Sequence, residues 1–229
     1  MTAIVNMSEA TAREEICRVG ESLFQRGYVH ATAGNISVRL DHGFLITPTD
    51  ACLGFLDPAD LALLDHDGNQ VSGKRGSKTI ALHRKIYEAS DHAPGSWPAR
   101  CVIHTHSTHC VGLSLQAKGP ELLPPITPYF VMKVGHVPLI PYFRPGDVLA
   151  ADAVADAILH YAKVDTPIRA VMLSRLGPNV WHQDLTQAMA TLEELEETAK
   201  LMQLNVAQPP QALSAEHIEE LRQTFGAAW

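Results

Sequence analysis

Hydrophobic residues recur at helical spacing in several segments of the chain. Ile16, Val19 and Leu23 lie three or four positions apart, and they follow Thr11 and Glu14, which have the spacing of a capping box at a helix start. The same kind of spacing predicts amphipathic helices over residues 11–27, 77–90, 149–162, 184–202 and 214–225.

Shorter runs between these helices have the composition of β-strands. They are rich in valine, isoleucine, leucine and phenylalanine, and the turns Asp41–Gly43 and Asp65–Asn69 predict two hairpins. Strands interleaved with amphipathic helices predict an α/β fold, with helices on both sides of a mixed sheet in a three-layer α/β/α arrangement. The expected strands cover residues 35–40, 43–47, 61–64, 70–72, 101–106, 137–140 and 169–173.

Composition narrows the choice of domain organisation and partners. The 229 residues are 46% hydrophobic, enough for a buried core, and Pro209-Pro210 is the one clear linker signal. We expect a single domain over residues 1–229, with residues 207–229 as a C-terminal extension. A formal net charge of −7 argues against a nucleic-acid partner, so an anionic substrate would need a local basic site. The four cysteines lack a C-x-x-C pair and should be free thiols.

The N-terminal segment and the apolar runs bear on localisation. Residues 1–10 lack the apolar core of a signal peptide, and no apolar run approaches the roughly 20 residues that a membrane helix requires. We therefore expect a cytoplasmic protein without a membrane partner.

Two histidines two positions apart form the strongest candidate for a metal site. His104 and His106 lie in the stretch Cys101–Ser107, and residues i and i+2 of a strand point to the same face about 6.5 to 7 Å apart. Both imidazoles can therefore bind one ion. The spacing alone is equally compatible with two hydrogen-bonded histidines at a polar end of the sheet.

A second group of polar residues has the features of an anion site. It consists of Gly34-Asn35, Thr47-Pro48-Thr49, and Ser77-Lys78 at the start of an expected helix. A helix N-terminus presents unpaired N–H groups and the positive end of the helix dipole, and a hydroxyl and an ammonium group add to the attraction for phosphate. Taken singly, each piece is also typical of an ordinary turn or capped helix.

Taken in order, the motifs resemble those of the class II aldolase/adducin family, and the likeness covers roughly residues 12–203. The motifs are Gly34–Ser37, Ile46–Thr49, the helix after Ser77 with His83 and Tyr87, His104–Ser107, and Gly177-Pro178. Within the family the chain looks most like the 3-oxo-tetronate 4-phosphate decarboxylases. The segments that carry this closer likeness are residues 24–28, 127–129, 131–135, 141–147 and 192–199.

The resemblance implies a fold, a metal and a set of site residues. The sheet would be mixed but largely antiparallel, and His104 and His106 would be metal ligands, most often for zinc. Family enzymes are typically tetramers, so a homo-oligomer with a phosphorylated sugar-acid substrate is implied as well. The residues expected to bind the substrate phosphate are Gly34, Asn35, Thr49, Ser77 and Lys78.

Three positions depart from the family pattern. Family aldolases carry an acid–base glutamate where this chain has Thr79, and a third metal-binding histidine where it has Leu176. Asp50 stands where a glycine often closes the Thr-Pro-Thr turn. Catalytic zinc usually has three protein ligands, so a replacement for Leu176 is needed unless the substrate's own oxygens complete the site. His136 is our first candidate for that replacement, followed by His109, His30 and His182.

Thr79 fits decarboxylation better than aldol cleavage. An aldolase must remove a carbon-bound proton with a positioned base, whereas a β-keto acid that loses carbon dioxide gives the same enediolate without that step. We therefore expect a metal-dependent lyase that converts 3-oxo-tetronate 4-phosphate to dihydroxyacetone phosphate and carbon dioxide. Tyr129, or a water on the ion, would donate the final proton, and Lys78 would neutralise carboxylate or phosphate charge.

Two other functions are compatible with the sequence. A class II sugar-phosphate aldolase or epimerase would need a base other than Thr79 near the ion. A noncatalytic, adducin-like assembly domain would account for the loss of two site residues, but it would have no need of the retained histidine pair and phosphate-site residues.

Overall fold

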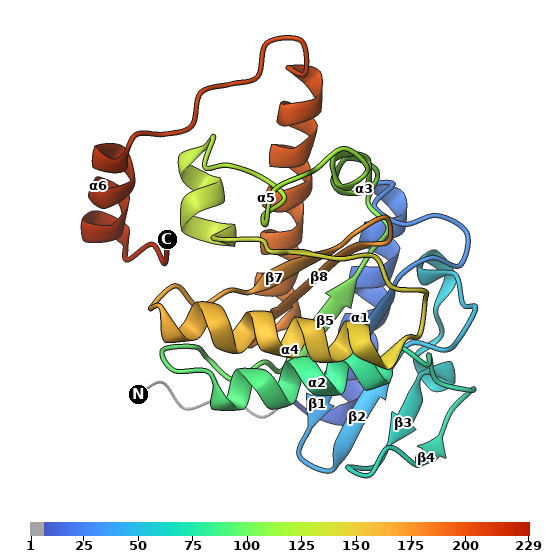
Figure 1. The fold of residues 1–229 in the computed structure, drawn as a ribbon. Helices are drawn as coiled ribbons and strands as arrows, with labels where there is room; N and C mark the ends of the chain where they lie inside the picture. The colour runs from blue at the N-terminus through green and yellow to red at the C-terminus, as the bar shows by residue number, and fades with distance from the viewer. Residues whose placement is uncertain (1–6) are drawn as a thin grey trace.

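Eight strands form one sheet through the middle of residues 7–229, which are the part of the chain that the computed structural model describes (Figure 1). The strand order is β4-β3-β2-β1-β5-β8-β7-β6. All neighbouring pairs are antiparallel except β6 and β7, so the sheet is mixed and largely antiparallel, as expected. The strands are β1 (Asn35–Leu40), β2 (Gly43–Ile46), β3 (Ala62–Leu64), β4 (Gln70–Ser72), β5 (Cys101–His104), β6 (Leu139–Ile140), β7 (Ala170–Leu173) and β8 (Gly177–His182).

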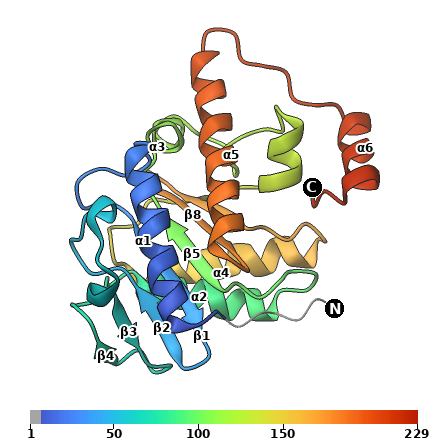
Figure 2. The same ribbon diagram turned by 180° about the vertical axis from the view of Figure 1, so that it is seen from behind.

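Helices cover both faces of this sheet. In Figure 1, α2 (Ile80–His92) and α4 (Val148–Lys163) lie in front of the sheet, and Figure 2 shows α1 (Glu9–Gln25) and α5 (Leu185–Leu204) on the other side. Two apolar clusters fill the spaces between the layers, one under α1 and α5 and the other under α2 and α4. The three-layer α/β/α prediction is confirmed.

The β1–β2 and β3–β4 hairpins are confirmed, but the sequence prediction misses the central strand β8. Gly177-Pro178 has the composition of a turn, and proline is normally excluded from the middle of a sheet. Here the carbonyl oxygen of Pro178 accepts a hydrogen bond from the Thr105 N–H at 3.3 Å. Since proline lacks only the donor, it can still pair through its carbonyl group.

Two helix starts differ from prediction. The N-cap of α1 is Ser8, whose hydroxyl accepts from the Thr11 N–H, so the helix begins ahead of the expected capping box. The second helix begins at Ile80, and Ser77 belongs to the turn before it. The predicted N-cap of α5 is confirmed, because the Asp184 carboxylate accepts from the Gln187 N–H at 2.8 Å.

The remaining elements connect or flank these layers. The short α3 (Thr108–Ser114) and the π-helical turn η3 (Phe130–Val134) are absent from the sequence prediction, as are the 3-10 turns η1 (Leu53–Phe55) and η2 (Pro58–Asp60). The expected C-terminal helix is α6 (Ala215–Phe225), which stands apart from the sheet in both ribbon views.

Two further predictions concern the cysteines and membrane-spanning helices. The four cysteines are free thiols, as predicted. No helix among the described residues is both long and apolar enough to cross a membrane. Part of the N-terminal segment that lacks signal-peptide character, residues 1–6, lies outside the described residues.

Candidate metal and phosphate site

The two histidines of the predicted metal site lie at the end of β5, although only the first belongs to the strand. His104 is the last residue of β5, and His106 lies in the short connection to α3. The expectation of a strand through His106 is therefore wrong. The chain nevertheless brings the two imidazoles together, with ring centroids 5.0 Å apart and ring planes at 68°.

His104 is held in the form that binds a metal. Its Nδ1 lies 3.0 Å from the carbonyl oxygen of Pro178, which can only accept, so Nδ1 carries the proton and Nε2 has a free lone pair. Burial, reinforced by His106, lowers the pKa of His104 to about 4. The pKa of His106 is lowered by burial and by His30. His104 is therefore neutral at pH 7, and the same two effects favour the neutral form of His106.

Two glycines allow neighbouring backbone segments to approach this end of β5. Gly34 has φ = 84°, and a Cβ atom there would lie 2.9 Å from the His104 carbonyl oxygen. Gly177 has φ = 149°, and a Cβ atom there would lie only 1.8 Å from the Thr105 carbonyl oxygen. A larger residue at either position would displace the backbone that carries the histidine pair.

The predicted phosphate-site motifs meet beside this strand end. The side-chain oxygen of Thr47 accepts from the Ile36 N–H at 3.2 Å, and its carbonyl oxygen accepts from the Ser77 N–H at 3.1 Å. The Thr49 N–H donates to the Arg75 carbonyl at 2.8 Å. Three segments that are far apart in the sequence are thus joined by backbone hydrogen bonds.

The turn before α2 holds the residues that depart from, or would act in, the family site. The hydroxyls of Ser77 and Thr79 hydrogen-bond to each other at 2.8 Å, and Lys78 is exposed. Asp50 closes a different turn, the one that follows Thr47-Pro48-Thr49. It has φ = 56°, a left-handed conformation that favours glycine, and this explains why glycine is common at that position in the family. The hydroxyl of Thr79 is thus bound to the hydroxyl of Ser77, which is one of the residues expected to bind phosphate.

Three of the four candidate replacement ligands are held by other partners. His136 Nδ1 lies 2.8 Å from a Glu121 carboxylate oxygen, and its ring stacks on Trp229 at 4.2 Å. His109 Nδ1 lies 2.8 Å from Glu196. His182 Nδ1 accepts from the Gln183 N–H at the opposite end of β8. The structure therefore does not bring our first candidate, His136, to the histidine pair.

His30 is the remaining candidate, and it lies beside His106. The two ring centroids are 6.4 Å apart, but His30 is exposed. Within residues 7–229, no three histidine, cysteine, aspartate or glutamate side chains are arranged to hold one ion. Leu176 packs against the apolar cluster under α2 and α4. Tyr129, the expected proton donor, is 60% exposed at the start of η3.

Buried polar residues surround His104, and of these Asn179 is the one that sequence reasoning misses. Asn35 of β1 and Asn179 of β8 are its direct neighbours across the sheet. His83 of α2 is fully buried, and its Nδ1 lies 2.7 Å from the Ser37 hydroxyl. Three buried atoms, Asn35 Oδ1, His83 Nε2 and Asn179 Nδ2, have no hydrogen-bond partner among the described residues. An asparagine between the apolar residues of β8 is the sequence signal for this feature.

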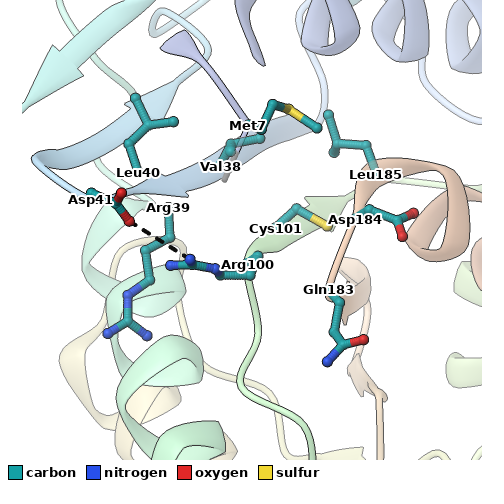
Figure 3. A pocket seen from close by; sticks show the side chains of 10 residues that line it. All are labelled: Met7, Val38, Arg39, Leu40, Asp41, Arg100, Cys101, Gln183, Asp184 and Leu185. Carbon is teal, nitrogen blue, oxygen red and sulfur yellow. Dashed lines mark ion pairs between the residues drawn. The ribbon is translucent and has the colours of Figure 1, made fainter. Parts of the chain in front are cut away.

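A separate small cavity lies at the other end of the same strands (Figure 3). Its volume is about 80 Å³, and its walls come from the end of β1, the start of β5 and the segment after β8. The two cationic groups that line it are paired, Arg100 with Asp41 at 3.7 Å and Arg39 with Asp91. The cavity is therefore distinct from the histidine pair and offers no free cation to a phosphate.

The chain is similar to known proteins over most of its length. The family model described as "Class II Aldolase and Adducin N-terminal domain" matches residues 14–203. The chain belongs to this family. Among class II aldolase relatives, the 3-oxo-tetronate 4-phosphate decarboxylase of Cupriavidus necator is 50% identical over 97% of this chain and 99% of its own length. The protein of the same name from Escherichia coli K12 is 40% identical, over 93% of this chain and 96% of its own.

A solved structure of a class II aldolase relative has the same fold. The crystal structure of YgbL from Escherichia coli superimposes with a TM-score of 0.81 and 39% sequence identity. The match covers 93% of this chain and 99% of the other. The family and the fold class predicted from the sequence are therefore both confirmed.

Proposed function

We propose that this class II aldolase family member is a metal-dependent carboxy-lyase that converts 3-oxo-tetronate 4-phosphate to dihydroxyacetone phosphate and carbon dioxide. The observation that carries the proposal is the pairing of a buried, neutral His104 with His106 beside the phosphate-site motifs. Relatives that are 50% and 40% identical over nearly the whole chain bear the name of this reaction.

The residues at the strand end fit a divalent ion. His104 offers Nε2 with its tautomer set by Pro178, His106 lies beside it, and buried polar atoms without partners surround them. A divalent ion held there, with zinc the first to test, would stabilise the negative charge that develops as carbon dioxide leaves. Burial keeps His104 neutral, so the ion does not have to displace a proton from it near pH 7.

We assign the substrate phosphate to the turn before α2. The Gly34-Asn35 turn, Thr49 and Ser77 are joined through Thr47, and the exposed Lys78 supplies a positive charge. This placement puts the phosphate beside the histidine pair, so a four-carbon acid bound there would reach the metal with its other end.

Proton transfer in this reaction requires a donor for the product and no base. The Thr79 hydroxyl is bonded to Ser77, and threonine is a poor base, so we assign it no proton abstraction. Loss of carbon dioxide needs none. We keep Tyr129, or a water molecule, as the donor that protonates the product, and the exposed position of Tyr129 leaves its hydroxyl accessible.

We also propose a homotetramer located in the cytoplasm, with residues 207–229 as an extension of one domain. Support for self-association comes from the exposed apolar side chains Tyr142, Val148 and Leu149, which follow β6 and start α4. Apolar groups clustered on a surface are typical of interfaces between subunits.

The test is metal content followed by product analysis. Protein purified without chelator should carry about one divalent ion per chain, and both His104→Ala and His106→Ala should lose the ion and at least about 100-fold in carbon dioxide release, because metal and two ligands act as a unit. His182→Ala, at the far end of β8, is the matched control and should keep both properties.

Three results would count against the proposal. Metal content unchanged by either histidine substitution would remove the pair from the site. Retro-aldol cleavage faster than carbon dioxide release would favour the aldolase alternative. A folded protein with neither metal nor turnover would favour the noncatalytic assembly role.

A further inference from the structure

The position at which family aldolases carry the third metal-binding histidine is apolar in this chain. Leu176 packs among the apolar side chains under α2 and α4. A leucine side chain has no donor atom for a metal. If the site holds an ion through three protein ligands, another residue must supply the third.

Asn179 is placed to be that group. It lies on β8 directly opposite His104, and its side chain is on the same face of the sheet because antiparallel partners share a face. Directly paired residues have Cβ atoms about 4.5 to 5.5 Å apart, within the reach of an imidazole and an amide. The next residue on this face of β8, Trp181, packs in the apolar cluster under α2 and α4.

Burial makes this asparagine unusual. Asn179 is 1% exposed, and its Nδ2 has no hydrogen-bond partner among the described residues. A buried amide without a partner destabilises the folded protein, so native proteins rarely retain one without a compensating role. The other two partnerless buried atoms, Asn35 Oδ1 and His83 Nε2, belong to residues on the same side of the sheet near His104.

We propose that Asn179 is the third protein ligand of the metal site, and that it binds through its amide oxygen in place of the missing histidine. The proposal rests on the metal-dependent function proposed above. Rotation of the amide by 180° about the Cβ–Cγ bond exchanges its oxygen and nitrogen, and this nitrogen has no hydrogen bond to lose. The rotation would bring the oxygen to the buried position of the nitrogen, on the face of the sheet that carries His104.

The resulting donor set has a chemical consequence. Two imidazole nitrogens and one oxygen form a set that zinc accepts, but a neutral amide oxygen is a weaker donor than a third imidazole. Asn35, which is assigned to the phosphate, pairs with His104 on its other side and is not counted in this donor set. We therefore expect this site to discriminate less strongly between zinc and manganese than a site of three histidines does.

The experiment compares zinc affinity with the stability of the metal-free protein. Asn179→Leu has a similar volume and no donor, and it should weaken zinc binding at least tenfold, measured by competition with a chromogenic chelator. Urea unfolding of the metal-free variant should show equal or greater stability, because a partnerless polar group is gone. Asn179→Asp restores an oxygen with a negative charge and should bind zinc at least as tightly as the wild type.

The control for loss of a buried polar group is a substitution far from His104 in the sequence. Thr198→Val removes a buried polar group on α5 and should leave zinc affinity unchanged. If Asn179→Leu binds zinc like the wild type while His104→Ala does not bind, Asn179 is not a ligand and the proposed function stands. Lower stability of metal-free Asn179→Leu, with Asn179→Asp failing to restore zinc binding, would show a structural role. A wild type without metal would overturn both proposals.

Discussion

Single backbone atoms determine the shape of the site around His104. Gly177 approaches Thr105 so closely that any side chain would overlap the Thr105 carbonyl oxygen. The Gly177-Pro178 motif therefore has a steric reason beyond turn formation. The same segment sets the tautomer of His104 through the Pro178 carbonyl, so two neighbouring residues fix both the position and the protonation of this histidine.

Gly177→Ala should lower the free energy of unfolding by at least about 2 kcal/mol and weaken metal binding, because the methyl group would push β8 away from the strand end. Urea denaturation and metal titration measure the two effects. Gly146→Ala is the matched control, since Gly146 also has positive φ (79°) but open space at its Cβ position. Gly146→Ala should lower the free energy of unfolding by about 1 kcal/mol and leave metal binding unchanged. Equal effects of the two substitutions would contradict the steric explanation.

A buried carboxylate on α5 fixes the start of α3, the helix that follows the histidine pair. Glu196 is 2% exposed. One of its oxygens accepts from the His109 N–H at 2.9 Å, and the other accepts from the Cys110 N–H at 3.0 Å. Because α3 begins two residues after His106, this contact between elements orients the connection that carries the second histidine of the pair.

Glu196→Ala should destabilise the protein by about 3 kcal/mol, because two buried N–H groups lose their acceptor. It should also weaken metal binding, whereas Glu196→Gln should recover part of both losses by keeping one acceptor oxygen. Glu193→Ala is the control on the same helix, since its ion pair with Arg26 is solvent-accessible and is worth at most about 1 kcal/mol. Unaltered metal affinity in Glu196→Ala would show that Glu196 stabilises α3 alone.

Burial of His83 links the stability of the whole molecule to pH. Complete burial, assisted by the nearby His104, lowers the pKa of His83 from 6.5 to about 3. Below pH 6.5 His83 binds a proton in the unfolded chain but not in the folded chain. The free energy of unfolding therefore has its full value from this group above pH 6.5 and decreases as the pH drops toward 3. The contribution of this one group is at most about 1.4 kcal/mol per pH unit.

His83→Leu should therefore flatten the dependence of unfolding free energy on pH between 6 and 4.5, even if the substitution changes stability at pH 7.5. Urea unfolding at several pH values, with each protein referred to its own value at pH 7.5, measures the slope. A slope identical to that of the wild type would show that His83 does not titrate on unfolding.

The five longer helices, the two hairpins and the main candidate-site motifs could be predicted from the sequence because they depend on neighbouring residues. Apolar spacing along one segment determines which face of a helix is buried, and turn residues determine where a hairpin reverses. The histidine pair and the segments around Asn35, Thr49 and Ser77 were found for the same reason, since each motif is short and continuous.

Tertiary structure alone decided which distant residues share the site. Strand β8 takes a central place because it pairs on both sides, which its turn-like start conceals. That pairing brings Asn179 opposite His104, while His136 is drawn to Glu121 and Trp229. The register of a sheet depends on contacts between segments far apart in the chain, and local periodicity carries no information about it. The sequence by itself therefore determined the five longer helices, the two hairpins and the candidate histidine pair, and the fold decided which residues surround that pair.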